Sequence, residues 1–197
     1  MFWLTGTPLS QYLDFFEVHS EYEEASTVLE VGVGRATAIK QMSLDKKEIY
    51  AIDISDTALN KVSALTKIYN VGEIEKLPSN SIDLAFSFLV AQHINDEMFT
   101  HHLTHILPAL KKDGIFCLHY AGELDGNKND QGQAAQERGG IVRTSSLIQE
   151  LVEDSGGFII KDTVRQAGLV PYEANPEKSY EYSWRAAIVR RNNANPQ

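Results

Sequence analysis

A glycine-rich turn after a short apolar strand is the strongest chemical signal in the sequence. Residues 28–37 read VLEVGVGRAT, and a helix is expected from about Ala36. Glycine lets the backbone turn tightly and lets a ligand approach without a Cβ in the way. The free N–H groups at the start of a helix favour a polar or anionic ligand. Because two such glycines also occur in ordinary strand-to-helix turns, the motif by itself indicates only a candidate binding loop.

An aspartate at a suitable spacing supports this candidate loop. Asp53 ends a second apolar strand, 21 positions after Gly32. In a strand–helix–strand unit, this spacing puts a carboxylate beside the glycine turn, where it can accept both ribose hydroxyls of a nucleoside. The alternative is an aspartate that caps a helix. Together the turn and the carboxylate predict a ligand that contains a nucleoside.

Two ligand classes fit this pair, and Glu30 discriminates between them. A nicotinamide or flavin dinucleotide would bring its pyrophosphate to the glycine turn, where a carboxylate two residues before Gly32 repels it. S-adenosylmethionine carries an ammonium and a sulfonium and no phosphate. Glu30 therefore favours S-adenosylmethionine on electrostatic grounds.

The elements that must position these residues alternate between apolar strands and helices, which predicts a parallel sheet with helices on both faces. Expected strands are 27–31, 48–52, 68–72, 82–87, 115–120, 158–165 and 181–190. Expected helices are 8–22, one from about 36, 56–66 capped by Ser55, one capped by Asn95, and 145–155. Long loops are expected at 121–143 and 171–180.

The order of these motifs resembles class I S-adenosylmethionine-dependent methyltransferases of the small-molecule type. Residues 28–37 are similar to the family's first motif, and 71–94 to its acidic-x-x-x-Leu-Pro stretch and following strand. Residues 107–118 and 145–158 are similar to its fifth-strand turn and late helix. The resemblance implies an α/β fold: a Rossmann-like three-layer sandwich with a mostly parallel seven-stranded sheet and a C-terminal antiparallel hairpin. It implies one methyltransferase domain over 1–197, with a helical cap at 1–25, a catalytic core at 26–191 and a tail at 192–197.

The resemblance also implies which residues bind the cofactor S-adenosylmethionine, whose product would be S-adenosylhomocysteine. They are Glu30, Gly32, Gly34, Asp53, Ile54, Glu73, Ile74, Ser87 and Phe88. Glu30, Gly32 and Gly34 would hold the methionine end. Asp53 would bind the ribose, and Ile54 would line the face of the adenine. Glu73 and Ile74 would meet the edge of the adenine. Ser87 and Phe88 would flank the methionine portion and the reacting methyl. The sequence departs from the family at Ala36, where a third glycine is usual.

Other side chains are predicted on the side of the methyl acceptor. His93 follows the fourth strand and is the predicted general base, because imidazole titrates near neutral pH. A histidine satisfied by backbone groups is the alternative. Arg35, His119, Tyr120 and Tyr172 are the candidates for binding the acceptor. The alternatives are a solvated cation for Arg35 and packing for the other three.

The amino-acid composition limits the classes of partner and the location that are expected for the protein. The formal net charge of −9 disfavours nucleic acid, because an acidic surface repels phosphate backbones. The single cysteine, Cys117, lies in an apolar strand and is expected to be buried, which fits a reducing, cytoplasmic location. No stretch is long and apolar enough to span a membrane. His101, His102 and His105 share a helix without supporting carboxylates, so no metal site is predicted.

Three functional hypotheses follow. The first is a methyltransferase that acts on a small molecule, as a monomer or a homodimer. The second is a protein that binds S-adenosylmethionine or S-adenosylhomocysteine without turnover, since no decisive acid or base is evident beyond His93. The third is an NAD-dependent oxidoreductase, which Glu30 disfavours. The loops at 121–143 and 171–180 are predicted to select the acceptor, because ligands of open α/β sheets bind beyond the carboxyl ends of the strands.

Overall fold

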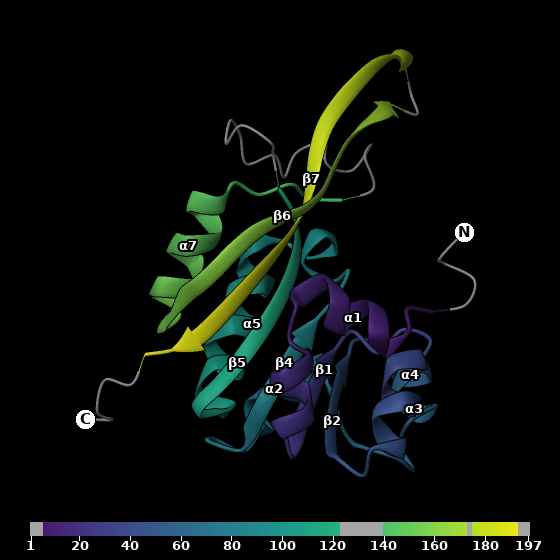
Figure 1. Ribbon diagram of the computed structural model, residues 1–197, viewed down its shortest axis with the longest axis vertical. Helices are drawn as coiled ribbons and strands as arrows, with labels where there is room; N and C mark the ends of the chain where they lie inside the picture. The colour runs from purple at the N-terminus through teal and green to yellow at the C-terminus, as the bar shows by residue number, and fades with distance from the viewer. Residues whose placement is uncertain (1–5, 123–139, 173–174, 193–197) are drawn as a thin grey trace.

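The computed structural model describes residues 6–122, 140–172 and 175–192, without the side chains of 167–182 (Figure 1). Seven strands alternate with α-helices and two short 3₁₀ helices, η2 and η3. In chain order the elements are α1 (Leu9–Phe16), α2 (His19–Glu24), β1 (Thr27–Val31), α3 (Thr37–Leu44), β2 (Glu48–Asp53), α4 (Asp56–Asn60), β3 (Lys67–Asn70), η2 (Val71–Lys76), β4 (Ile82–Ser87), η3 (Ala91–His93), α5 (Asp96–Ala109), β5 (Leu110–Gly122), α7 (Ser145–Asp154), β6 (Gly157–Tyr172) and β7 (Asn175–Arg191).

The strands form one sheet in the order β3-β2-β1-β4-β5-β7-β6. The pairs from β3 to β5 are parallel, and β7 runs antiparallel to both β5 and β6. The predicted fold class, a mostly parallel seven-stranded sheet with a C-terminal antiparallel hairpin, is therefore confirmed. In Figure 1 the β6–β7 hairpin extends beyond the end of β5.

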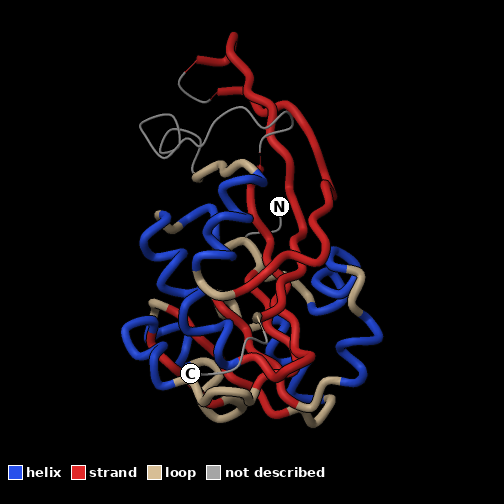
Figure 2. The backbone as a smooth tube through the Cα atoms, turned by 90° about the vertical axis from the view of Figure 1, so that its left-hand side faces the viewer, coloured by secondary structure: helices blue, strands red, loops and turns tan. Residues whose placement is uncertain are grey.

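Helices cover both faces of the sheet (Figure 2). Because successive side chains of a strand point to opposite faces, each strand contributes to two apolar cores. Val28 packs in one core with side chains from α1 to α4, and Leu29 packs in the other with side chains from α5 and α7. The buried Cys117 lies in the first of these cores, as expected of a strand residue.

The predicted helix over 8–22 is interrupted. Glu17 adopts a left-handed conformation with φ of 57°, so α1 ends at Phe16 and α2 begins at His19. The Glu17 carboxylate accepts hydrogen bonds from Lys161 Nζ at 2.5 Å and Arg165 Nη1 at 2.6 Å, both on β6. The turn buries Phe16 and Val18 together in the core. A helical periodicity that spans both helices cannot reveal this break, because the contact that fixes it comes from the other end of the chain.

Other predicted boundaries also differ, among them the start of β5, which is Leu110 and not residue 115. The helix capped by Ser55 ends at Asn60, well short of residue 66. The loop predicted over 171–180 is mostly strand, since β6 runs to Tyr172 and β7 starts at Asn175. Proline predicts a break because it cannot donate a ladder hydrogen bond. Here Pro171 lies on β6, the edge strand, beside an irregularity in the register, where that loss is tolerated.

The cap of α5 gives a test of local stability. Asn95 accepts a hydrogen bond from the Met98 backbone N–H at 2.9 Å, as the sequence predicts. Asn95→Ala should lower the free energy of unfolding by about 1 kcal/mol in urea titrations, because it leaves that donor without its cap. Thr104→Ala, at an exposed position of the same helix, is the control and should change it by less than about 0.5 kcal/mol. Equal effects of the two substitutions would contradict the cap.

Candidate functional site

The glycine turn lies at the carboxyl end of β1, between β2 and β4. Gly32 has φ of +85°, and a Cβ there would come within 2.3 Å of Val90 Cγ2. Gly34 has φ of +50°, and a Cβ there would meet nothing within 4 Å. Gly32 is thus required by close packing against the segment after β4, whereas Gly34 leaves open space above the backbone. Ala36 also takes a positive φ, 65°, as the cap before α3, so it adopts the conformation that suits the glycine expected there.

Asp53 ends β2 beside this turn, as its spacing predicts. One carboxylate oxygen accepts the Gly34 N–H at 3.1 Å, and the other accepts the Ser55 N–H at 2.8 Å. The cap of α4 is Ser55, whose hydroxyl accepts the Ala58 N–H at 3.3 Å. Asp53 therefore ties the turn after β1 to the turn after β2, and its partly exposed carboxylate retains further lone pairs.

Glu30 is buried in β1 with 2% of its surface exposed. Its Oε1 accepts a hydrogen bond from the Tyr12 hydroxyl at 2.7 Å, whereas its Oε2 is buried with no partner among the described residues. The pKa of Glu30 is raised to about 8 as the net result of three effects: burial raises it most, the hydrogen bond from Tyr12 lowers it, and the negative charge of Asp53 raises it. A buried, half-satisfied carboxyl is costly unless a further donor completes it.

The segments predicted to meet an adenine are joined by Asn70, at the end of β3. Its side-chain amide donates to the Ile54 carbonyl at 3.3 Å, and its Oδ1 accepts the Gly72 N–H at 3.2 Å. Ile54 is 78% exposed and presents an apolar surface next to Asp53. Glu73 is exposed and pairs with Lys76, and the Ile74 side chain is buried in the core. The sequence analysis did not identify Asn70, although an asparagine is a common cap residue at the start of a helical turn such as η2.

Aromatic rings gather at the carboxyl ends of β4 and β5. Ser87 and Phe88 are both buried. The Phe88 ring stacks on Tyr12 at 4.6 Å between centroids and on His119 at 4.7 Å. Leu89 follows with φ of 61°, an uncommon conformation for a branched residue. Phe88 therefore lies between α1 and β5, where the sequence places the acceptor side.

His119 is held as a neutral imidazole. Its Nδ1 accepts the Leu89 backbone N–H at 3.1 Å, which fixes the Nε2–H tautomer of the neutral ring. Burial lowers the pKa of His119 to about 3. Trp184 packs on the ring at 4.9 Å. Near neutral pH this ring is a fixed hydrogen-bond donor and a weak base.

His93 lies in η3, after β4, where the sequence predicts it. The side chain is exposed, and its Nε2 is 3.4 Å from the side-chain nitrogen of Gln92. Partial desolvation of the ring lowers its pKa. No carboxylate contacts this imidazole within the described part of the chain. The base role of His93 stays a prediction.

The remaining acceptor-side candidates are not brought together. Tyr120 is on the opposite face of β5 from His119, and its hydroxyl donates to Asp162 at 2.7 Å and accepts from Arg185 Nε at 2.9 Å. Arg35 is exposed on the glycine turn. The side chain of Tyr172 is outside the described residues. Tyr120 is thus a buried part of the sheet's other core, as its packing alternative predicts.

Arg143 organises the segment after β4 and was not singled out from the sequence. It is fully buried, and its guanidinium donates to Asp96 Oδ1 at 2.7 Å and to the carbonyls of Ala91 and Ile94, both at 2.6 Å. Its backbone N–H donates to the Ala121 carbonyl at 2.9 Å. The side chain and the backbone of this one residue therefore connect η3 and the start of α5 to the end of β5. Nothing in its sequence neighbourhood distinguishes it from a surface arginine.

A groove of about 580 Å³ lies at the opposite end of the sheet, by the amino ends of β4 and β5, and includes none of the predicted site residues. It is lined by the starts of β4 and β5, the α1–α2 turn and the end of β7. Within the described ranges no group of three or more His, Cys, Asp or Glu side chains could hold a metal ion. No helix in the same part of the chain is long and apolar enough to cross a membrane.

Comparison with known proteins agrees with this geometry. Residues 29–118 match a family model described as a methyltransferase domain. No curated protein sequence matches the chain. The matched region runs from β1 to β5 and so includes the glycine turn, Asp53 and the segment after β4.

Solved structures share the fold at low sequence identity. The 1,6-didemethyltoxoflavin N1-methyltransferase of Burkholderia thailandensis is 14% identical, with a TM-score of 0.62, over 97% of this chain and 81% of that one. A methyltransferase of Methanosarcina mazei is 13% identical, with a TM-score of 0.63, over 89% and 97%. The [4+2]-cyclase SpnF is 13% identical, with a TM-score of 0.67, over 93% and 80%. Together with the family match, this fold confirms the resemblance to class I S-adenosylmethionine-dependent methyltransferases.

The burial of His119 predicts a pH dependence of stability. Its pKa is about 3 in the folded chain against an ordinary value of 6.5, so between these pH values the unfolded chain binds the extra proton. The stabilisation is complete above pH 6.5 and is lost as the pH falls toward 3. At pH 5 the loss amounts to about 2 kcal/mol. His119→Asn, which can keep an acceptor for Leu89, should show a correspondingly shallower fall in urea titrations at pH 7 and pH 5. Parallel pH dependences would contradict this account.

The Arg143 network predicts a large loss of stability. Arg143→Met should lower the free energy of unfolding by about 3 kcal/mol, because it removes the buried guanidinium that donates to a partly buried carboxylate and to two carbonyls. Arg143→Lys should recover little, since one ammonium cannot reproduce the guanidinium fork. Lys112→Met, which removes an exposed cation, should have an effect of less than about 0.5 kcal/mol in the same urea titration. A loss below about 1 kcal/mol in Arg143→Met would contradict the assignment.

Proposed function

We propose that this chain transfers a methyl group from S-adenosylmethionine to a small-molecule acceptor. One observation carries the proposal: the carboxyl groups of Glu30 and Asp53 flank a glycine turn at the carboxyl ends of two adjacent parallel strands. That is the place where open α/β sheets bind nucleosides. The Burkholderia methyltransferase with this fold has S-adenosylhomocysteine and 1,6-didemethyltoxoflavin bound, which supports the cofactor and the acceptor class.

The residues present fit the cofactor. The unpartnered Oε2 of Glu30 suits an ammonium group, because a cation would complete a buried carboxyl and favour its ionised form. The open space at Gly34 suits a ligand that lies against the backbone. Asp53 keeps lone pairs for two ribose hydroxyls, and the exposed Ile54 offers an apolar surface to the adenine.

The chain's own residues would bind, orient and shield the reactants. When bound, the cofactor supplies an electrophilic methyl group on a sulfonium. Glu30 and Asp53 would fix its two ends, and the stacked rings of Tyr12, Phe88 and His119 would exclude water beside them. His93 would take the proton of an acceptor that must lose one. Arg35, on the glycine turn, would serve acidic acceptors.

The other two hypotheses are less well supported. Glu30 disfavours a dinucleotide, because a buried carboxyl beside the turn leaves no favourable place for a pyrophosphate. Binding without turnover would share the cofactor site, so it is separated by release of S-adenosylhomocysteine during incubation with panels of small acceptors. Sustained binding without product across such panels would favour the non-catalytic alternative.

Ligand-induced stabilisation tests the cofactor. S-adenosylhomocysteine or S-adenosylmethionine at 100 times Kd should add about 2.7 kcal/mol and raise Tm by several degrees. NAD should give no shift. Asp53→Ala should abolish the shift, because it removes the acceptor for the ribose hydroxyls.

Asp113→Ala is the matched control, since it removes one exposed carboxylate at the opposite end of the sheet. It should retain the full shift. Stabilisation of the wild type by NAD alone would overturn the proposal.

A further inference from the structure

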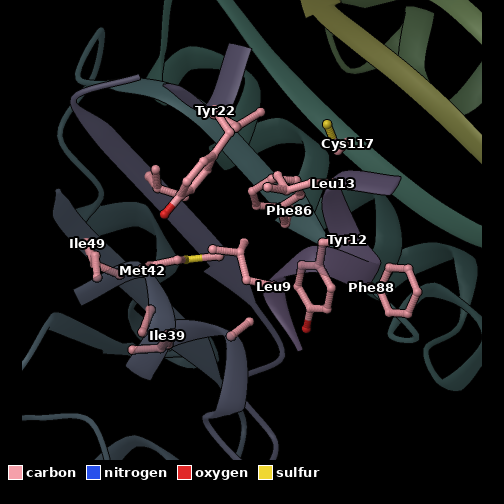
Figure 3. Close-up of a cluster of buried hydrophobic side chains, with 14 of the residues drawn as sticks. Leu9, Tyr12, Leu13, Tyr22, Ile39, Met42, Ile49, Phe86, Phe88 and Cys117 are labelled. Atoms are coloured by element: carbon pink, nitrogen blue, oxygen red, sulfur yellow. The ribbon is translucent and has the colours of Figure 1, made fainter. Parts of the chain in front are cut away.

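Tyr12 comes from α1, before the region that matches the methyltransferase domain. Tyr12 is 5% exposed, and its side chain contacts Glu30 on β1 and Phe86 on β4. Figure 3 shows its ring beside Phe88. The two rings are nearly parallel, with an interplanar angle of 15°. Tyr12 is thus fixed by packing, and its hydroxyl has a defined direction.

The hydroxyl reaches the carboxyl of the proposed cofactor site. It donates to Glu30 Oε1 at 2.7 Å, and Oε2 has no partner in the described ranges. One oxygen of the carboxyl is therefore satisfied by the protein and the other is left for a ligand. We propose that Tyr12 is a positioning residue of the cofactor site, which holds Glu30 so that its second oxygen accepts the ligand's ammonium group. This inference rests on the proposed function and deepens it.

The electrostatics of the pair explain why a donor from α1 matters. Burial and, to a smaller extent, the negative charge of Asp53 on β2 raise the pKa of Glu30, which is about 8 in the folded chain. Tyr12 on α1 is the group that counteracts these effects among the titratable side chains acting on Glu30 in the described chain. Removing its hydroxyl therefore moves the carboxyl toward the neutral form at neutral pH. A neutral carboxyl attracts an ammonium less strongly than a carboxylate does.

A second tyrosine–carboxylate pair provides a matched control. Tyr22, on α2, is 6% exposed, and its hydroxyl donates to Asp45 Oδ2 at 2.7 Å. This pair also joins a tyrosine hydroxyl to a carboxylate, with the same bond length. It lies at the C-terminal end of α3, whereas the glycine turn precedes the N-terminal end of that helix. Tyr22→Phe therefore reports the cost of losing such a bond without touching the site.

The experiment measures binding by calorimetry for wild type, Tyr12→Phe and Tyr22→Phe. The two ligands are S-adenosylhomocysteine and 5′-methylthioadenosine, which lacks the amino acid portion. Tyr12→Phe should weaken binding of S-adenosylhomocysteine about tenfold, the size expected for one hydrogen bond to a charged group, and leave 5′-methylthioadenosine unchanged. Tyr22→Phe should change neither. Unchanged affinity of Tyr12→Phe for S-adenosylhomocysteine, or an equal loss for both ligands, would overturn the inference.

The pH profile gives a readout that a merely structural role would not move. In the wild type, affinity for S-adenosylhomocysteine should rise about fivefold from pH 7 to pH 8 as Glu30 ionises, and Glu30→Gln should remove this rise. In Tyr12→Phe the rise should shift to higher pH. A flat wild-type profile would also overturn the inference. A wild type that does not bind S-adenosylhomocysteine at all would instead refute the proposed function, so the two failures are distinguishable.

Discussion

The position of the site depends on the order of the parallel strands. β1 is hydrogen-bonded to β2 on one side and to β4 on the other. After β1 the chain enters α3 on one face of the sheet, and after β4 it enters α5 on the opposite face. The two turns therefore diverge at the carboxyl ends of the strands, which is the place where open α/β sheets bind ligands. The near contact between Gly32 and Val90 shows how closely the two turns approach each other where they leave the sheet.

A buried carboxyl is the main electrostatic feature beside these turns. Glu30 is almost inaccessible, and its charge is balanced by no cation among the described contacts. Burial of an ionised group without a partner is expensive, and here the cost is reduced by a raised pKa and by one tyrosine hydroxyl. A cationic ligand would remove the remaining cost. The unfavourable free energy of this buried carboxyl thus arises at the place where we propose that the cofactor binds.

The elements that depend on local patterning could be predicted from the sequence. The strand periodicity, the glycine turn, the position of Asp53 and the caps Ser55 and Asn95 all arise from residues close together in the chain, and each is found as expected. The order of these strands, helices and motifs along the chain also predicted the fold class correctly.

Contacts between distant segments could not be predicted in this way. Tyr12 meets Glu30 across 18 positions, and Arg143 meets Ala91 across 52. Glu17 is fixed by β6, which follows it by more than 140 positions. Tyr120 is of a residue type that is common in binding sites. However, successive side chains of β5 point to opposite faces of the sheet, so Tyr120 points away from His119. In each case the deciding partner is supplied by the tertiary fold.

The fold by itself does not define the reaction, since a [4+2]-cyclase shares it with the methyltransferases. The proposed function therefore rests on Glu30, Asp53 and the turn between them. The most direct test is a crystal structure of the chain with S-adenosylhomocysteine. We expect the ribose hydroxyls on Asp53, the ammonium on the free oxygen of Glu30, and the Tyr12 hydroxyl still on the other oxygen. A ligand bound elsewhere, or one that contacts neither carboxyl group, would contradict the account.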